Sequence, residues 1–199
     1  MKNKNIVWIM ASVLCLAAPI GAQAPASSGH SGFHAAIGAG YGSIAFTCNV
    51  CSDTRESSTA LMLRLGGAVR PDLVLSGEVT GWSNGFSLGT ESATWINLVA
   101  QYYPERTGGF FLKGGVGVAT LSSNTISNGA GYLKFETTSV GGVIGIGFDV
   151  RLSKSFSLTA YIDLLYATPA HGDPKVNGGR SGTTLGANMI HLGLAASWR

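Results

Sequence analysis

The chain has 199 residues, enough for one ordinary domain, and only 12% of them are charged whereas 29 are glycine. This composition excludes a long disordered tail, a coiled coil and a nucleic-acid-binding protein, and the formal net charge of +3 identifies no acidic partner. Past the N-terminal segment no apolar run approaches the roughly 20 residues of a membrane-spanning helix, so a helical membrane protein is excluded as well.

Residues 1–24 have the layout of a secretory signal peptide. Lys2 and Lys4 precede an apolar stretch over 6–18, and the small residues that follow allow cleavage after Ala24 or Ala26. The apolar stretch is too short to span a membrane, which disfavours a permanent anchor. We therefore expect an exported protein with a short N-terminal segment over 25–31 and one folded domain over 32–199.

Two cysteines remain after such a cleavage, Cys48 and Cys51, and they lie in a polar stretch. In an exported protein this close spacing favours a small disulfide loop over a metal site, because no second pair of Cys or His residues completes four ligands. The sequence predicts no cofactor and no metal centre.

From Phe33 onward, apolar residues alternate with small or polar residues at a period of two, which is the pattern of β-strands. The predicted strands cover 33–42, 60–69, 73–80, 96–103, 110–118, 140–151, 156–166 and 190–198. One face of each strand is apolar, and the opposite face consists mostly of Gly, Ala, Ser and Thr. With about ten residues each, such strands are long enough to cross a bilayer at a tilt.

The connectors between these strands alternate in length. Short turns lie near 70–72, 104–109 and 152–155, and long polar connectors lie near 47–57, 83–92, 122–131 and 168–182. Bacterial outer-membrane barrels have short turns on the inside and long loops on the outside. Aromatic residues near the strand ends would then form the girdle at the membrane interface: Phe33, Tyr102, Tyr103, Phe110, Phe148, Phe156, Tyr166 and Trp198.

A soluble barrel of the lipocalin kind alternates with the same period, but it places the apolar face inside. Its water-facing residues should be rich in charge, whereas the small face here carries about one charge per strand. Small residues suit the interior of an eight-stranded barrel, which side chains just fill. We therefore expect the apolar face to contact lipid.

The polar residues of the small face would then point into the lumen: Arg64, Glu78, Gln101, Lys113, Asp149, Arg151, Asp163 and His191. A turn centred on Pro71 places Arg64 opposite Glu78 and Val69 opposite Leu73. By the same counting Gln101 falls near Lys113, and Asp163 and His191 lie on neighbouring strands. Because a buried charge without a partner is costly, these groups should neutralise one another and form a polar plug.

With these strands and turns the chain resembles the small eight-stranded outer-membrane proteins of the OmpA and OmpX type. The residues that carry the resemblance are Gln101–Pro104 before a glycine-rich turn, Lys113–Gly117 after it, the strand from Gly141 to Asp149 and the closing strand from Ile190 to Trp198. The family usually ends on an aromatic residue, whereas Arg199 follows Trp198 here.

The resemblance implies an all-β, eight-stranded antiparallel up-and-down transmembrane β-barrel in the cell outer membrane. It also implies contact with outer-membrane lipid and insertion by the barrel-assembly machinery. The leading functional hypothesis is a structural or surface-interaction protein whose four outer loops meet an external partner that the sequence does not identify.

Two other functions are open at this point. One is a narrow conduit for small solutes or ions. The other is an enzyme acting on lipid at the outer rim, where His171, Asp173 and Ser181 share one connector. Their spacing matches no nucleophile motif, so the sequence predicts no catalytic residue and no enzyme.

Overall fold

A computed structural model describes residues 31–48, 55–86, 89–106, 108–127, 131–171, 173–175 and 184–199. The predicted signal peptide, its cleavage sites and Cys51 lie outside these residues. In the described part of the chain, no helix has the length and hydrophobicity that crossing a bilayer requires.

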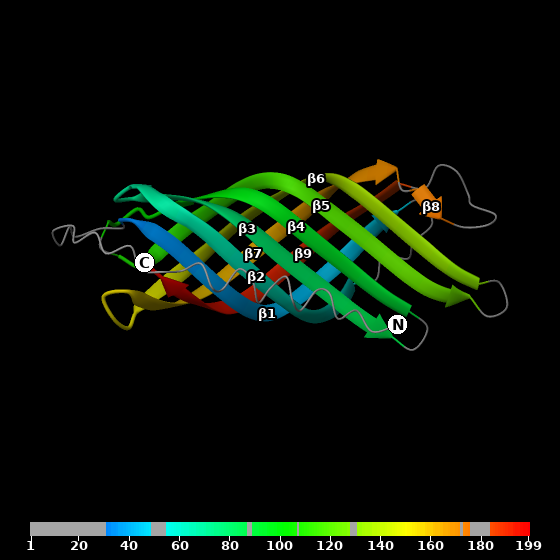
Figure 1. Ribbon diagram of the computed structural model, residues 1–199, viewed down its shortest axis with the longest axis horizontal. Coiled ribbons are helices and arrows are strands. Elements are labelled where there is room, and N and C mark those ends of the chain that lie inside the picture. Colours follow the sequence, from blue (N-terminus) through cyan, green and yellow to red (C-terminus); the bar gives the residue numbers. More distant parts are fainter. Residues whose placement is uncertain are drawn as a thin grey trace.

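Eight antiparallel strands close into a barrel, as the sequence pattern predicted (Figure 1). Neighbouring strands in the chain pair with one another, and β1 closes the barrel by pairing with β9. A short additional strand, β8, pairs with β6. The bounds are β1 Phe33–Cys48, β2 Arg55–Arg70, β3 Leu73–Phe86, β4 Gly89–Tyr102, β5 Phe110–Ser127, β6 Gly131–Arg151, β7 Phe156–His171, β8 Asp173–Lys175 and β9 Thr184–Trp198.

The apolar face of the strands points outward. Leu98 is 66% exposed and Ile146 is 47% exposed, whereas Arg64 and Glu78 are each 1% exposed. This orientation suits a barrel whose surroundings are hydrocarbon rather than water. The lipocalin-like alternative, which requires the opposite arrangement, is therefore wrong.

The two ends of the barrel differ in strand length. At one end, here called the short-turn end, lie the start of β1, the end of β9 and the turns after β2, β4 and β6. At the other, here called the outer end, β5 and β6 pair as far as Ser127 and Gly131. With 18 and 21 residues these two strands exceed the roughly 9–11 residues that a crossing needs.

The prediction of long connectors between the strands is therefore largely wrong. Much of the polar sequence near 47–57, 83–92 and 122–131 belongs to strands, because Ser and Thr residues continue the ladder beyond the apolar belt. A polar composition marked the end of the lipid-facing surface and did not mark the end of the strand.

The register of the first short turn differs from the prediction by one pair. Arg64 does pair with Glu78, but a β-bulge between Ala68 and Arg70 places Arg70, and not Val69, opposite Leu73. A bulge inserts one unpaired residue, so symmetric counting from the turn fails next to it.

Large inward rings pack over inward glycines of nearby strands. A Cβ atom added to Gly42 would lie 2.7 Å from the Trp82 ring, and one added to Gly147 would overlap the Phe111 ring. The narrow interior thus takes a large side chain only where another strand contributes none.

We expect Gly147→Ala to destabilise the barrel by about 1–3 kcal/mol, because overpacking a filled interior costs energy of that order. The added Cβ would also lie 2.9 Å from the Ala160 carbonyl oxygen, so the backbone as well as the Phe111 ring would have to move. The measurement is the temperature at which the folded band of an unboiled gel sample disappears. Gly114→Ala on β5 is the control, since its Cβ meets nothing within 4 Å; equal temperatures for both variants would contradict the packing account.

Candidate functional site: the closed lumen

Four inward charges meet in the middle of the barrel, and we call Arg64, Glu78, Lys113 and Asp163 the central network. Arg64 Nε donates to Glu78 Oε2 at 2.8 Å, and Lys113 Nζ donates to both oxygens of Glu78 at 3.0 Å. Lys113 Nζ also donates to Asp163 Oδ2 at 2.6 Å. All four side chains are almost fully buried, so two positive and two negative charges neutralise one another away from water.

Tyr161 and His191 flank this network. The Tyr161 hydroxyl lies 3.2 Å from His191 Nε2, and Lys113 Nζ lies 5.8 Å from the centre of the Tyr161 ring. The ladder pairs Asp163 with His191, which are the neighbours that the sequence predicted. Tyr161, although it stands on the small face of its strand, was not singled out in the sequence.

Two buried amides beside the network lack a hydrogen-bond partner in the part of the chain that the structure describes. Gln101 is opposite Lys113 in the ladder, and Asn97 is opposite Glu78. Neither side chain hydrogen-bonds to a described residue, although both are at most 2% exposed. A buried polar group of this kind is a natural place for an ordered water molecule.

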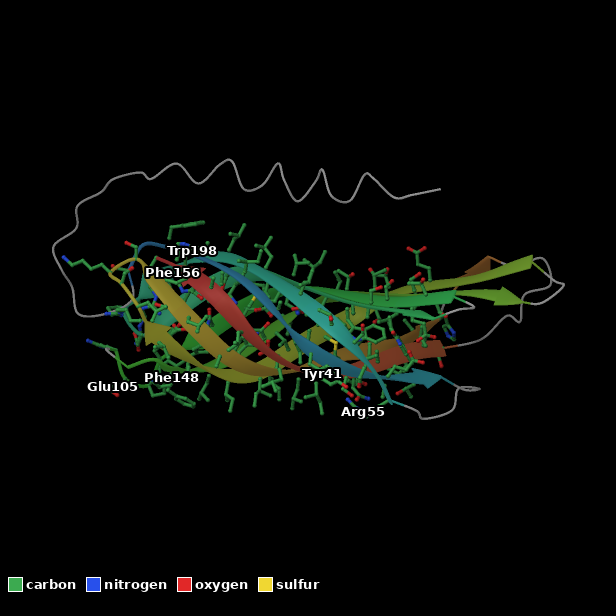
Figure 2. All side chains as sticks on the ribbon, turned by 90° about the horizontal axis from the view of Figure 1, so that it is seen from below. Tyr41, Arg55, Glu105, Phe148, Phe156 and Trp198 are labelled. Atoms are coloured by element: carbon green, nitrogen blue, oxygen red, sulfur yellow. The ribbon has the colours of Figure 1, made fainter. Side chains whose placement is uncertain are left out.

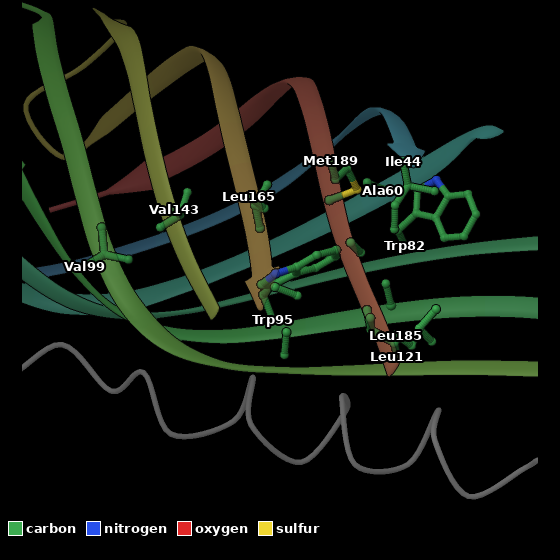
Figure 3. Packing of buried hydrophobic residues seen from close by; sticks show 14 residues of the cluster. Ile44, Ala60, Trp82, Trp95, Val99, Leu121, Val143, Leu165, Leu185 and Met189 are labelled. Atoms are coloured by element: carbon green, nitrogen blue, oxygen red, sulfur yellow. The ribbon is translucent and has the colours of Figure 1, made fainter. Parts of the chain in front are cut away.

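An apolar section fills the lumen on the outer side of the central network. Figure 3 shows the Trp82 and Trp95 rings inside the barrel wall among the smaller apolar side chains. Trp82 Nε1 donates to the Gly42 carbonyl at 3.1 Å, and Trp95 Nε1 donates to the Tyr166 carbonyl of β7 at 3.2 Å. The section comprises Ile44, Ala60, Trp82, Ala93, Trp95, Val99, Ala119, Leu121, Val143, Leu165, Ala167, Leu185, Ala187 and Met189.

The prediction of a wholly polar plug is thus wrong for this part of the lumen. Strand parity could have found both tryptophans, since Trp82 continues the face of Glu78 and Trp95 continues the face of Asn97. The alternation continues past the inward polar residues of both strands.

A second polar cluster, the inner network, lies at the short-turn end around Asp149. Its carboxylate accepts hydrogen bonds from the Tyr103 hydroxyl at 3.0 Å and from Thr159 Oγ1 at 2.6 Å. Arg199 Nη2 donates to the same carboxylate. Burial and the neighbouring carboxylate raise the pKa of Tyr103, so its hydroxyl remains the donor.

Two predictions at this end are wrong. Tyr103, expected in the interfacial girdle because it lies near a strand end, is fully buried, because it shares the inward face of Gln101 and packs against Phe111. Arg151, expected in the lumen, is exposed, because β6 reaches the rim at this residue.

The remaining girdle residues lie on the outer wall. Figure 2 shows Phe148, Phe156 and Trp198 around the short-turn end, and the Phe156 and Trp198 ring centres are 5.5 Å apart. Phe33, Tyr102, Phe110 and Tyr166 are likewise exposed on the outer face.

Other sequence candidates fall partly outside the described residues. Cys48 ends β1 but Cys51 is not described, so the disulfide stays a prediction. His171 ends β7 and Asp173 begins β8, whereas Ser181 is not described.

The chain matches a sequence family and several solved barrels. The family described as outer membrane protein beta-barrel domain matches residues 11–197. No curated protein matches the chain in sequence. Solved structures that share its fold include three outer-membrane or surface proteins, whose sequence identities to this chain are too low to show more than the fold.

The first is Ail, the attachment invasion locus protein of Yersinia pestis, with 15% identity over 82% of this chain and 97% of that one, and a TM-score of 0.57. The second is Neisserial surface protein A, with 15% identity over 84% and 97% and a TM-score of 0.54. The third is OprG from Pseudomonas aeruginosa, with 16% identity over 85% and 98% and a TM-score of 0.52.

We expect Glu78→Gln to lower the free energy of unfolding by about 3–5 kcal/mol, because it leaves Arg64 and Lys113 with only the Asp163 carboxylate. The measurement is urea unfolding in lipid vesicles. Arg70→Gln is the matched control: its ion pair with Asp72 has an arginine side chain that is 64% exposed, so its loss should cost less than about 1 kcal/mol. Similar losses in the two variants would show that the central network contributes no more to the free energy of unfolding than an exposed ion pair does.

Proposed function

Because the chain belongs to the outer membrane protein beta-barrel domain family, we propose that it is a surface-interaction protein with a closed lumen, and that its outer end meets an external partner. The protein resides in the outer membrane, and no catalytic role forms part of this proposal. The observation that carries it is the contrast between an interior filled with side chains and strands that extend beyond the membrane.

The filled interior argues against a wide pore. Along β3 the inward residues run from Val74 through Glu78 to Trp82, so one strand contributes to three successive layers of the filling. The central network blocks the lumen by charge pairing, and the apolar section blocks it by packing. A solute would have to displace both, one after the other.

The extended outer end offers surface for contact. The ladder between β6 and β7 ends at Gly141, whereas the ladder between β5 and β6 continues to Gly131. At a rise of about 3.3 Å per residue, the segment 131–140 extends the β5–β6 hairpin along the strand by roughly 30 Å past the end of the β6–β7 ladder. By the usual orientation of such barrels, this end faces the exterior.

A narrow conduit is the second candidate, and the orphan amides of Asn97 and Gln101 favour it. Their polar atoms would suit water in the middle of the lumen. For a conduit, however, that water would have to connect past the two tryptophans of the apolar section.

Conductance in planar bilayers separates the two candidates. We expect no steady channels from the wild-type protein, and none from Trp82→Ala/Trp95→Ala, because the central network still closes the lumen in that variant. A porin of known conductance in the same bilayer serves as the positive control. Reproducible channels from the wild-type protein would favour the conduit.

Contact through the outer end is tested by shortening the β5–β6 hairpin. Replacing residues 124–134 by Asn-Gly should abolish adhesion of protein-expressing cells to host cells or to one another, while the heat-modifiable band shows that the barrel still forms. Glu105→Gln/Arg106→Gln, in the turn at the opposite end, is the control and should adhere like the wild type. Undiminished adhesion by the shortened protein, or none by the wild type, would contradict the proposal.

A further inference from the structure

One arginine lies outstretched on the outer wall of the barrel. Arg55 begins β2, and its side chain crosses β1 to reach β9. Nε donates to Ser43 Oγ at 3.3 Å, Nη2 to the Ser43 carbonyl at 2.8 Å and Nη1 to Asn188 Oδ1 at 2.9 Å. Three hydrogen bonds to two other strands therefore fix the plane and position of an exposed guanidinium.

The partners of this guanidinium are all neutral. In the described part of the chain, ion pairs with carboxylates are formed by Arg64, Arg70, Lys113 and Arg199. Arg55 instead binds a hydroxyl, a carbonyl and an amide oxygen. A guanidinium has five N–H donors, so two are left after these three bonds, and its charge has no counter-charge among its bonded partners.

The level of Arg55 on the wall is also distinctive, because the outer face changes character there. Toward the outer end, the large apolar outward side chains that the structure describes run as far as Tyr41, Leu61, Val79, Ile96, Val118, Val140, Tyr166 and Ile190, and all of these are exposed. The next outward residues toward the outer end are mostly hydroxyl or amide residues, namely Ser43, Thr59, Thr94, Thr120, Thr138, Thr168 and Asn188. Such a change marks the level at which lipid tails give way to headgroups.

Two exposed tyrosines are neighbours of the residues that hold the guanidinium. Tyr41 precedes Ser43 on the outer face of β1 and is 58% exposed, and Tyr166 pairs with Asn188 and is 53% exposed. Figure 2 shows Tyr41 and Arg55 along the barrel, away from the short-turn end. Between Arg55 and Asn188 stands Ala45 of β1, which pairs with both of them and has only a methyl side chain.

We propose that Arg55, held by Ser43 and Asn188 with Tyr41 and Tyr166 as the next residues on the wall, is a binding site for a phosphate group of an outer-leaflet lipid headgroup. A fixed guanidinium fork matches two oxygens of a phosphate, and orientation by the wall lowers the entropy lost on binding. The phosphate supplies the counter-charge that the protein partners lack. Such a site is independent of whether the lumen conducts and of whether the outer end binds a partner.

The test uses the full barrel refolded in maltoside micelles, which contain no phosphate. The readout is the Arg55 Nε–Hε resonance, assigned by its absence in Arg55→Gln, together with lipid affinity from fluorescence titration. The probe lipid is an acylated glucosamine disaccharide with two phosphates, and the comparison lipid is the same molecule without phosphate. Inorganic phosphate forms a separate arm.

We expect the phosphorylated lipid to shift the Arg55 resonance and to bind about tenfold less tightly to Arg55→Gln. Arg55→Lys should also bind less tightly, by about threefold, because a lysine keeps the charge but loses the fork. Asn188→Ala, which releases one anchor, should lose affinity while its folded band persists. Arg106→Gln, an exposed arginine at the opposite end, should bind like the wild type.

A shift with the lipid alone assigns the site to a headgroup, and a shift with inorganic phosphate as well assigns it to phosphate from either source; both outcomes support a phosphate site. Equal affinity of the wild type and Arg55→Gln for the phosphorylated lipid would overturn it. So would an equal loss in Arg106→Gln, or the same loss of affinity for the lipid without phosphate.

Discussion

The narrow interior of an eight-stranded barrel is the constraint on which the rest of this structure depends. Side chains can just fill such an interior, so a large group on one strand requires a small one nearby and a charge requires its counter-charge. Both requirements are met here by specific residues. The Phe111 ring lies where Gly147 has no side chain, and Lys113 lies between Glu78 and Asp163. The glycines opposite such large groups therefore meet a packing requirement, because a glycine continues the strand without placing a side chain in the interior.

The central network does more than neutralise charge, since it connects strands that are not neighbours in the ladder. Lys113 on β5 binds Glu78 on β3 and Asp163 on β7, so its ammonium group links three strands across the lumen. Apolar residues of similar volume would contribute comparable or greater stability at the same place. What the charges add is register, because a shift of one strand by one residue would turn its charge toward lipid. We infer that the network selects one closed barrel among the pairings that a repetitive alternating sequence allows.

Alternation with a period of two predicted the strands, and the scarcity of charge on the small face predicted which side contacts lipid. Counting from the turn at Pro71 predicted the ladder pair of Arg64 with Glu78. It failed next to the first short turn, where the bulge at Ala68/Arg70 displaced Val69. Tyr103 follows the inward parity of Gln101, so its assignment to the girdle, and not the alternation, was wrong. The bond between Lys113 and Glu78 was beyond local counting, because it depends on how the barrel closes. The lengths of β5 and β6 were underestimated because hydroxyl residues can continue a strand in water as well as in lipid headgroups.

The charges of the barrel therefore divide into two classes with different consequences. Those inside, such as Glu78 and Asp149, have their hydrogen-bonding capacity taken up largely by other strands and leave little for a solute. Arg55 is held as firmly, by three bonds to two strands, yet those bonds are to neutral groups and leave its charge available outside. Rigidity in the first case closes the lumen, and in the second it prepares a surface for an anion. The outward residues next to Ser43 and Asn188 are mostly hydroxyl or amide residues, and the low dielectric of the adjacent lipid screens charge less than water does. A fixed cation at this place therefore has more weight than it would have on a soluble protein.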